Sequence, residues 1–139
     1  MLEPFLGTWT YRSWVNDPDI NSDFAALEFG RATLSIIEAG PAEIGGTIGG
    51  PGWSLALHGT VDVGSPMHAS FQGVGVIGGA RWVYDYVAWR APDWPGSGPD
   101  QQVPALVGSV IRTVAHPTGG GGIAPAGVVA SFYAVFNEG

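Results

Sequence analysis

The sequence predicts an all-β protein: an eight-stranded antiparallel up-and-down β-barrel that takes in residues 1–139 as a single domain. Eight segments rich in β-branched and aromatic residues follow one another along the chain, each bounded by Gly, Pro, Asn or Asp. Most connections between them are short, so consecutive strands should pair antiparallel. Eight twisted strands of similar length tend to close into a ring, because closure removes both unpaired edges.

Each predicted strand ends at a turn signal, because Pro removes a backbone donor from the ladder and Gly permits positive φ. In chain order the predicted strands are Leu6–Trp14, Phe24–Glu38, Ala42–Ile48, Trp53–Val63, Met67–Ile77, Arg81–Arg90, Ala105–His116 and Gly127–Phe136. The breaks between them are residues 16–19, 39–41, 49–52, 64–66, 78–79, 92–104 and 117–126. An open sandwich is the competing architecture, but its crossovers would need longer loops.

The second predicted strand is the one segment that also resembles a helix. Glu28, Arg31 and several alanines are tolerated in helices, whereas Gly30 and the β-branched stretch 33–37 favour a strand. We expect a long strand with a bulge at Gly30. The acidic loop before it should lie at one barrel end as a lid, beside the glycine-rich turns.

The alternation of apolar and polar residues indicates which side chains face the barrel interior. Residues 53–63 alternate strictly, with Trp53 and Leu55 on the apolar face and His58 on the polar face. The segments 81–90 and 127–136 are apolar on both faces, which is typical of strands buried on both sides. We therefore expect a lumen on one side and a neighbouring subunit, in a homodimer or tetramer, on the other.

Composition excludes several partners and sites. The formal net charge is −7, with five arginines and no lysine, so the basic footprint of a nucleic-acid-binding protein is missing and an anionic membrane would repel the surface. No cysteine is present, which excludes disulfides and thiolate metal sites. The first residues carry no basic and apolar leader, and no stretch of about 18 apolar residues occurs. A cytoplasmic protein without a membrane segment is the expectation.

The stretch Leu6-Gly7-Thr8-Trp9-Thr10-Tyr11 resembles the Gly-x-Trp start of the calycins, which include lipocalins, fatty-acid-binding proteins and avidins. In those families the tryptophan packs across one end of an up-and-down barrel, so the resemblance implies this role for Trp9 and a small-ligand pocket in the barrel. The arginine that lipocalins carry on the last strand is not matched, because Arg112 falls on the seventh predicted strand. The avidin biotin site is not matched either, so the resemblance implies no particular ligand.

Three groups of polar residues suggest chemistry of their own. Residues 17–28 place oxygen side chains at the spacing of a calcium loop, but Ser22 stands where such loops need Gly and no helices are predicted beside it. Three histidines, His58, His68 and His116, are widely spaced, and no metal site is predicted from them. Asp85 lies among aromatic residues, where burial would raise its pKa and suit it to proton transfer; facing water or pairing with Arg112 is the alternative.

Two functions fit these observations, with a purely structural homo-oligomer as a third. The first is binding of a small, largely apolar or aromatic molecule in the barrel interior, without a cofactor. Its expected ligand-binding residues are Trp9, Tyr11, Trp53, Tyr84, Tyr86, Arg112 and Phe132, with Arg112 as an anchor for an anionic group. The second is a cofactor-free cyclase or isomerase that uses the same pocket, with Asp85 or His58 as the proton-transfer group. No hydrolase, phosphate-loop or dinucleotide motif occurs in the sequence.

Overall fold

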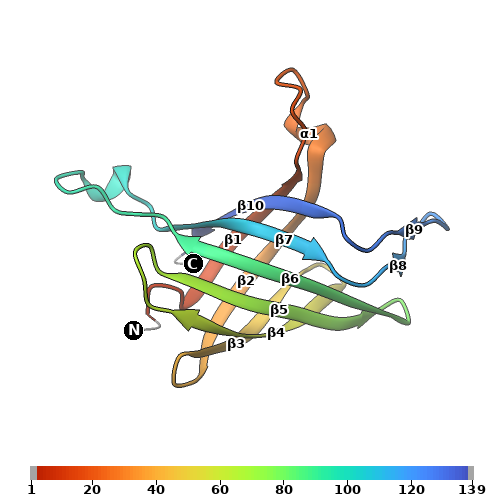
Figure 1. Ribbon diagram of the computed structural model, residues 1–139, viewed down its shortest axis with the longest axis horizontal. Helices are drawn as coiled ribbons and strands as arrows, with labels where there is room; N and C mark the ends of the chain where they lie inside the picture. Colours follow the sequence, from red (N-terminus) through yellow and green to blue (C-terminus); the bar gives the residue numbers. More distant parts are fainter. Residues whose placement is uncertain (1–2, 138–139) are drawn as a thin grey trace.

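A computed structural model describes residues 3–137 and shows a closed eight-stranded barrel in which all neighbouring strands are antiparallel (Figure 1). Its strands are β1 (Gly7–Val15), β2 (Glu28–Gly40), β3 (Glu43–Gly50), β4 (Trp53–Asp62), β5 (His68–Ile77), β6 (Ala80–Arg90), β7 (Ala105–Arg112) and β10 (Val129–Phe136). Each strand pairs with the next along the chain, and β1 also pairs with β10, where Trp9 lies opposite Phe136. The predicted all-β, eight-stranded antiparallel up-and-down barrel is confirmed.

The segment before β2 differs from the prediction, because residues 24–27 form a short helix, α1 (Phe24–Leu27), instead of strand. The Asp23 carboxylate accepts a hydrogen bond from the Ala25 backbone N–H at 3.3 Å, which is the N-cap arrangement that starts a helix. Farther along, Ser13 pairs with Gly30 whereas Trp14 pairs with Glu28. Phe29 is therefore the extra residue of a β-bulge next to Gly30, where an irregularity was expected.

The connection between β7 and β10 also carries structure that the sequence did not predict. Strand β7 ends at Arg112, earlier than predicted, and just beyond it the Thr113 hydroxyl and backbone N–H both donate to the Val83 carbonyl oxygen of β6. A two-stranded hairpin follows, formed by β8 (His116–Pro117) and β9 (Ile123–Ala124). A single 3-10 turn, η1 (Pro99–Gln101), lies in the loop between β6 and β7.

The barrel core follows from the period of two along each strand. Inward positions are buried, for example Leu34, Ile44, Leu57 and Val110, whereas most outward positions are partly or fully exposed. Gly108 occupies an inward position of β7, and a Cβ there would overlap the carbonyl oxygen of Val87 on β6. The close approach of these two strands therefore requires glycine.

One end of the barrel is closed by an aromatic plug. The Trp9 side chain is 1% exposed, its Nε1–H donates to the Phe5 carbonyl oxygen at 3.0 Å, and its ring meets Phe136 edge-on at a centroid distance of 5.3 Å. This is the position that the calycin resemblance implied for Trp9. Because consecutive strands alternate in direction, the opposite end carries the β1–β2, β3–β4 and β5–β6 connections together with the β8–β9 hairpin.

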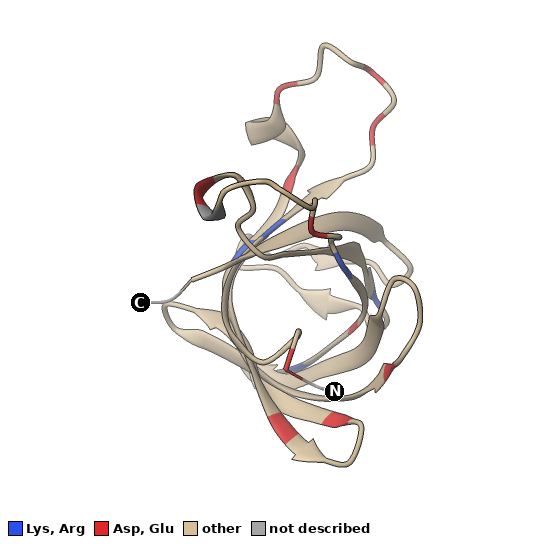
Figure 2. Cartoon of the chain, turned by 90° about the vertical axis from the view of Figure 1, so that its left-hand side faces the viewer, with Lys and Arg blue, Asp and Glu red and all other residues tan. Residues whose placement is uncertain are grey.

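The acidic β1–β2 loop stands away from the barrel instead of lying over its open end. Figures 1 and 2 show this loop and α1 projecting from the ring of strands. Contact with the barrel is made by Phe24, whose ring lies 5.6 Å from Trp14 on the outer face. The expected lid is therefore not formed by this loop. Among the described residues, no helix has the length and apolar character needed to cross a membrane.

Candidate ligand-binding site

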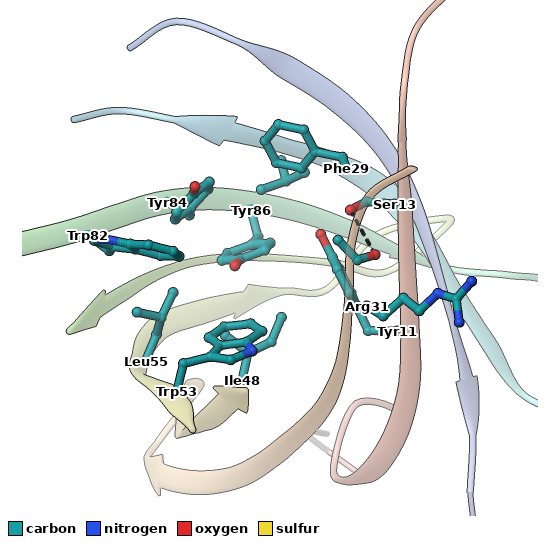
Figure 3. A pocket seen from close by; sticks show the side chains of 12 residues that line it. Tyr11, Ser13, Phe29, Arg31, Ile48, Trp53, Leu55, Trp82, Tyr84 and Tyr86 are labelled. Carbon is teal, nitrogen blue, oxygen red and sulfur yellow. Dashed lines mark hydrogen bonds between the residues drawn. The ribbon is translucent and has the colours of Figure 1, made fainter. Parts of the chain in front are cut away.

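A cavity of about 110 Å³ lies inside the barrel toward its open end (Figure 3). Residues of β1, β2, β3, β4, β6 and β7 line it, and most of its wall is aromatic or aliphatic. The lining residues are Tyr11, Ser13, Phe29, Gly30, Arg31, Ile48, Trp53, Leu55, Trp82, Tyr84, Tyr86 and Val110. The bulge in β2 brings Phe29 to this wall, since it places Phe29 and Gly30 opposite the single residue Ser13.

The structure brings together four of the predicted ligand-binding residues, Tyr11, Trp53, Tyr84 and Tyr86, at the cavity wall. Phe132 lies beside them, with ring centroid distances of 5.0 Å to Tyr11 and 6.2 Å to Tyr86, and supports these rings without lining the cavity. Trp9 does not line the cavity, because it belongs to the plug at the other end of the barrel.

Arg112 lies beside the cavity rim and does not line the cavity itself. Its Nε donates to the Tyr84 hydroxyl at 3.0 Å, and its Nη1 donates to the Pro125 carbonyl oxygen at 3.3 Å. The guanidinium also lies over the Phe29 ring, 4.9 Å from the centroid. These contacts hold Arg112 at the rim, and its predicted role as an anchor for an anionic group stays a prediction.

The floor of the cavity is an aromatic cluster that fixes two buried phenols. Tyr86 stacks on Phe71 at a centroid distance of 5.0 Å, and Tyr11 meets Tyr86 edge-on at 6.2 Å. Burial raises the pKa of both phenols, because a phenolate would lose its solvation there; the Ser13 hydroxyl lowers the pKa of Tyr11 and offsets part of the rise. Both side chains therefore remain neutral hydrogen-bond donors at physiological pH.

His116 is a residue at the cavity rim that sequence reasoning missed. It is 5% exposed, its Nε2 lies 2.8 Å from the Tyr84 hydroxyl, and its ring stacks on Trp82 at a centroid distance of 3.8 Å. Its Nδ1 lies 3.0 Å from the Pro117 carbonyl oxygen, which only accepts, so the hydrogen-bond network assigns the proton to Nδ1. Nε2 then accepts from Tyr84, which itself accepts from Arg112.

The two predicted proton-transfer residues lie outside the barrel, which corrects their expected place at the pocket. Asp85 lies between the inward residues Tyr84 and Tyr86, so alternation turns it to the outer face. Gln72 pairs with both His58 and Asp85 across the outer surface, and its Nε2 donates to the Asp85 carboxylate at 2.8 Å. Asp85 therefore hydrogen-bonds Gln72 and does not form the alternative pair with Arg112, which hydrogen-bonds Tyr84 instead.

The acidic loop uses its carboxylates to support its own backbone. Asp17 accepts from the Asp19 backbone N–H at 2.9 Å and from the Ser22 hydroxyl at 2.9 Å, and Asp19 accepts from the Asn21 backbone N–H at 3.0 Å. Over residues 3–137, no group of three or more His, Asp or Glu side chains is placed to hold a metal ion. The calcium-like spacing therefore corresponds to a series of Asx turns.

The later strands carry apolar side chains on their outer face. Trp89, Val107, Ile111 and Val129 on β6, β7 and β10 are all at least one-third exposed in the single chain. A homodimer or tetramer that covers this face stays a prediction.

Comparison with known proteins yields no match: no family model, curated protein or solved structure matches this chain. The closed eight-stranded antiparallel barrel and the tryptophan at its closed end are compatible with a calycin-like fold. Membership of that family stays a prediction, and the site has to be interpreted from its own geometry.

Proposed function

We propose that the protein binds a small, largely apolar ligand in the barrel interior, entering through the open end. The observation that supports this most directly is the aromatic cavity beside that end, closed off on its far side by the Trp9 plug. Small-molecule sites in proteins are concave, mostly apolar and furnished with a few polar groups that fix orientation. Here Tyr11, Tyr84 and Tyr86 supply such groups among rings and aliphatic side chains.

The cavity volume sets the size of the buried part of the ligand. About 110 Å³ is well below the roughly 300–1,000 Å³ of pockets that enclose drug-sized molecules. It is of the same order as the roughly 150 Å³ cavity that accommodates benzene in an engineered protein. The proposed ligand therefore buries one ring or a branched group of similar size, and any longer part extends through the mouth.

Gly30 offers a way to block the cavity without disturbing the barrel. Ser13 Oγ, at 3.6 Å, is the one heavy atom found within 4 Å of a Cβ built at Gly30, so a Leu side chain there would extend into the mouth. We expect Gly30→Leu to weaken the binding of ethylbenzene and other ring-sized compounds at least about tenfold, because the ligand must displace that side chain. Titration followed by the fluorescence of Trp53 and Trp82 measures this.

Gly98→Leu is the matched control, because a Cβ at Gly98 has no atom within 4 Å and the residue lies in the loop at the plugged end. It should bind ligands as the unmodified protein does. Failure of the unmodified protein to bind any ring-sized compound, or equal affinities for the Gly30→Leu variant and the control, would contradict the proposed function. A purely structural homo-oligomer would then be the better account.

A cofactor-free enzyme is the second candidate, favoured by the hydrogen-bonded series Arg112–Tyr84–His116 at the rim. In such an enzyme Tyr84 passes its hydroxyl proton to His116 Nε2, and the resulting phenolate oxygen takes a proton from a substrate carbon. Returning a proton to another carbon completes an isomerisation. The Nδ1–H contact with Pro117 and the face of Trp82 would stabilise the imidazolium, and Arg112 the phenolate.

Proton exchange at carbon separates this candidate from simple binding. In D2O, an enzyme of this type should incorporate deuterium into the methyl group of acetophenone, which NMR detects. Tyr84→Phe should slow this incorporation by about 100-fold or more, whereas it should change ethylbenzene affinity little. An incorporation rate equal to that of buffer would leave binding as the function.

A further inference from the structure

Two hydrogen-bond donors at the cavity have no protein partner. The Tyr86 residue is 4% exposed and lines the cavity, and within residues 3–137 its hydroxyl has no hydrogen-bond partner. Trp82 Nε1 is also buried, and within the same residues it has no acceptor. Buried polar groups in folded proteins almost always find a partner, so a buried unpaired Trp82 Nε1 near an unpaired Tyr86 hydroxyl points to an acceptor that the chain itself does not supply.

Figure 3 shows the Tyr86 hydroxyl on the side of its ring that faces Leu55 and Trp53 across the cavity. The ring cannot easily turn this hydroxyl elsewhere, because it is held between Phe71, Tyr11 and Phe132. A ligand bound in the cavity would therefore meet a donor at a fixed position. The pKa of Tyr86 is raised by burial, so the hydroxyl keeps its proton.

The cavity holds no fixed charge that would compensate an ionised ligand. Arg31 is the one ionisable cation or carboxylate among the lining residues; its side chain is 74% exposed and pairs with Glu28. Arg112 keeps its positive charge, because its partners Tyr84 and Pro125 are neutral, but it does not line the cavity. A carboxylate or ammonium group would lose its hydration in this apolar space without gaining a counter-ion.

We propose that the ligand carries an uncharged acceptor oxygen, such as a ketone or ester carbonyl on a ring-sized apolar group, and that the Tyr86 hydroxyl donates to it. Trp82, whose buried Nε1–H has no acceptor within residues 3–137, also lines the cavity. This inference rests on the proposed function and deepens it, because it names the chemical class that the cavity selects.

Three probes of similar shape test the inference: acetophenone, with a neutral carbonyl; ethylbenzene, with no acceptor; and benzoate, with a charged one. Affinities are measured by calorimetry for the unmodified protein and for Tyr86→Phe, which removes one oxygen and no known protein contact. The unmodified protein should bind acetophenone more tightly than benzoate. Tyr86→Phe should weaken acetophenone binding by about tenfold and change ethylbenzene binding by less than about twofold.

Tyr133→Phe is the matched control, since Tyr133 stacks on Trp14 outside the barrel and its hydroxyl contacts Arg12. It should leave all three affinities unchanged. If acetophenone and ethylbenzene both bind and Tyr86→Phe alters neither or both equally, the inference is wrong while the proposed function stands. The inference is equally wrong if benzoate binds as tightly as acetophenone. If none of the three probes binds, the proposed function fails and takes the inference with it.

Discussion

Replacing Trp9 by Ala is expected to lower the free energy of unfolding by about 3–5 kcal/mol, the range for removing a buried tryptophan from a packed core. The side chain is 1% exposed, fills the plugged end against Phe136, and donates to the Phe5 carbonyl oxygen. Removing the Trp9 side chain leaves a void at the plugged end and also leaves the Phe5 carbonyl oxygen without its hydrogen-bond donor. Equilibrium unfolding in guanidinium chloride, with the slope checked for constancy, measures the loss.

Trp94→Ala is the matched control for Trp9→Ala. Trp94 is 74% exposed in the β6–β7 loop, so its removal should change the free energy of unfolding by less than about 0.5 kcal/mol. The Trp9→Ala variant, where folded, should still bind ring-sized compounds, because Trp9 does not line the cavity. A loss below about 1 kcal/mol would show that the plug contributes little to stability.

Gly108→Ala is expected to destabilise the barrel by about 3 kcal/mol, the upper part of the range for overpacking a core. Its Cβ would overlap the Val87 carbonyl oxygen, a backbone atom that cannot move unless the β6–β7 ladder opens. The same unfolding experiment measures this change.

Gly120→Ala introduces the same methyl group into the β8–β9 hairpin, where a Cβ has no atom within 4 Å. This control should be close to neutral. Equal stabilities for the two variants would mean that β6 and β7 separate easily at Gly108, contrary to the close approach described above.

Much of the fold could be predicted from local patterns in the sequence. Turn residues marked where the chain reverses, and alternation marked which side chains face inward, as with Leu55, Tyr84 and Tyr86. The same alternation excludes Asp85 from the interior once its two tyrosine neighbours face inward. The aromatic residues beside Asp85 in sequence do not bury its side chain, because adjacent residues of a strand face opposite sides of the sheet.

The parts of the site that were missed depend on irregular backbone. Phe29 reaches the cavity because a bulge adds one residue to β2, and periodicity alone does not show which residue that is. His116 reaches Tyr84 because β7 stops at Arg112 and a small hairpin turns back. Thirty-two positions separate His116 from Tyr84, and no motif links them. Residues 24–27 were also missed, because the Asp23 N-cap starts a short helix there despite the strand preference of Phe24.

Because the Trp9 plug closes one end of the barrel, the cavity would be reached through the opposite end. A ligand whose ring binds in the cavity would enter ring first and leave ring last, so binding and release would use the same opening. A long substituent on the ligand would stay in water outside the barrel, where other molecules could contact it, while the ring of the ligand is buried. Side chains around that opening, among them His116 and Phe29, would then set the rate at which a ligand dissociates.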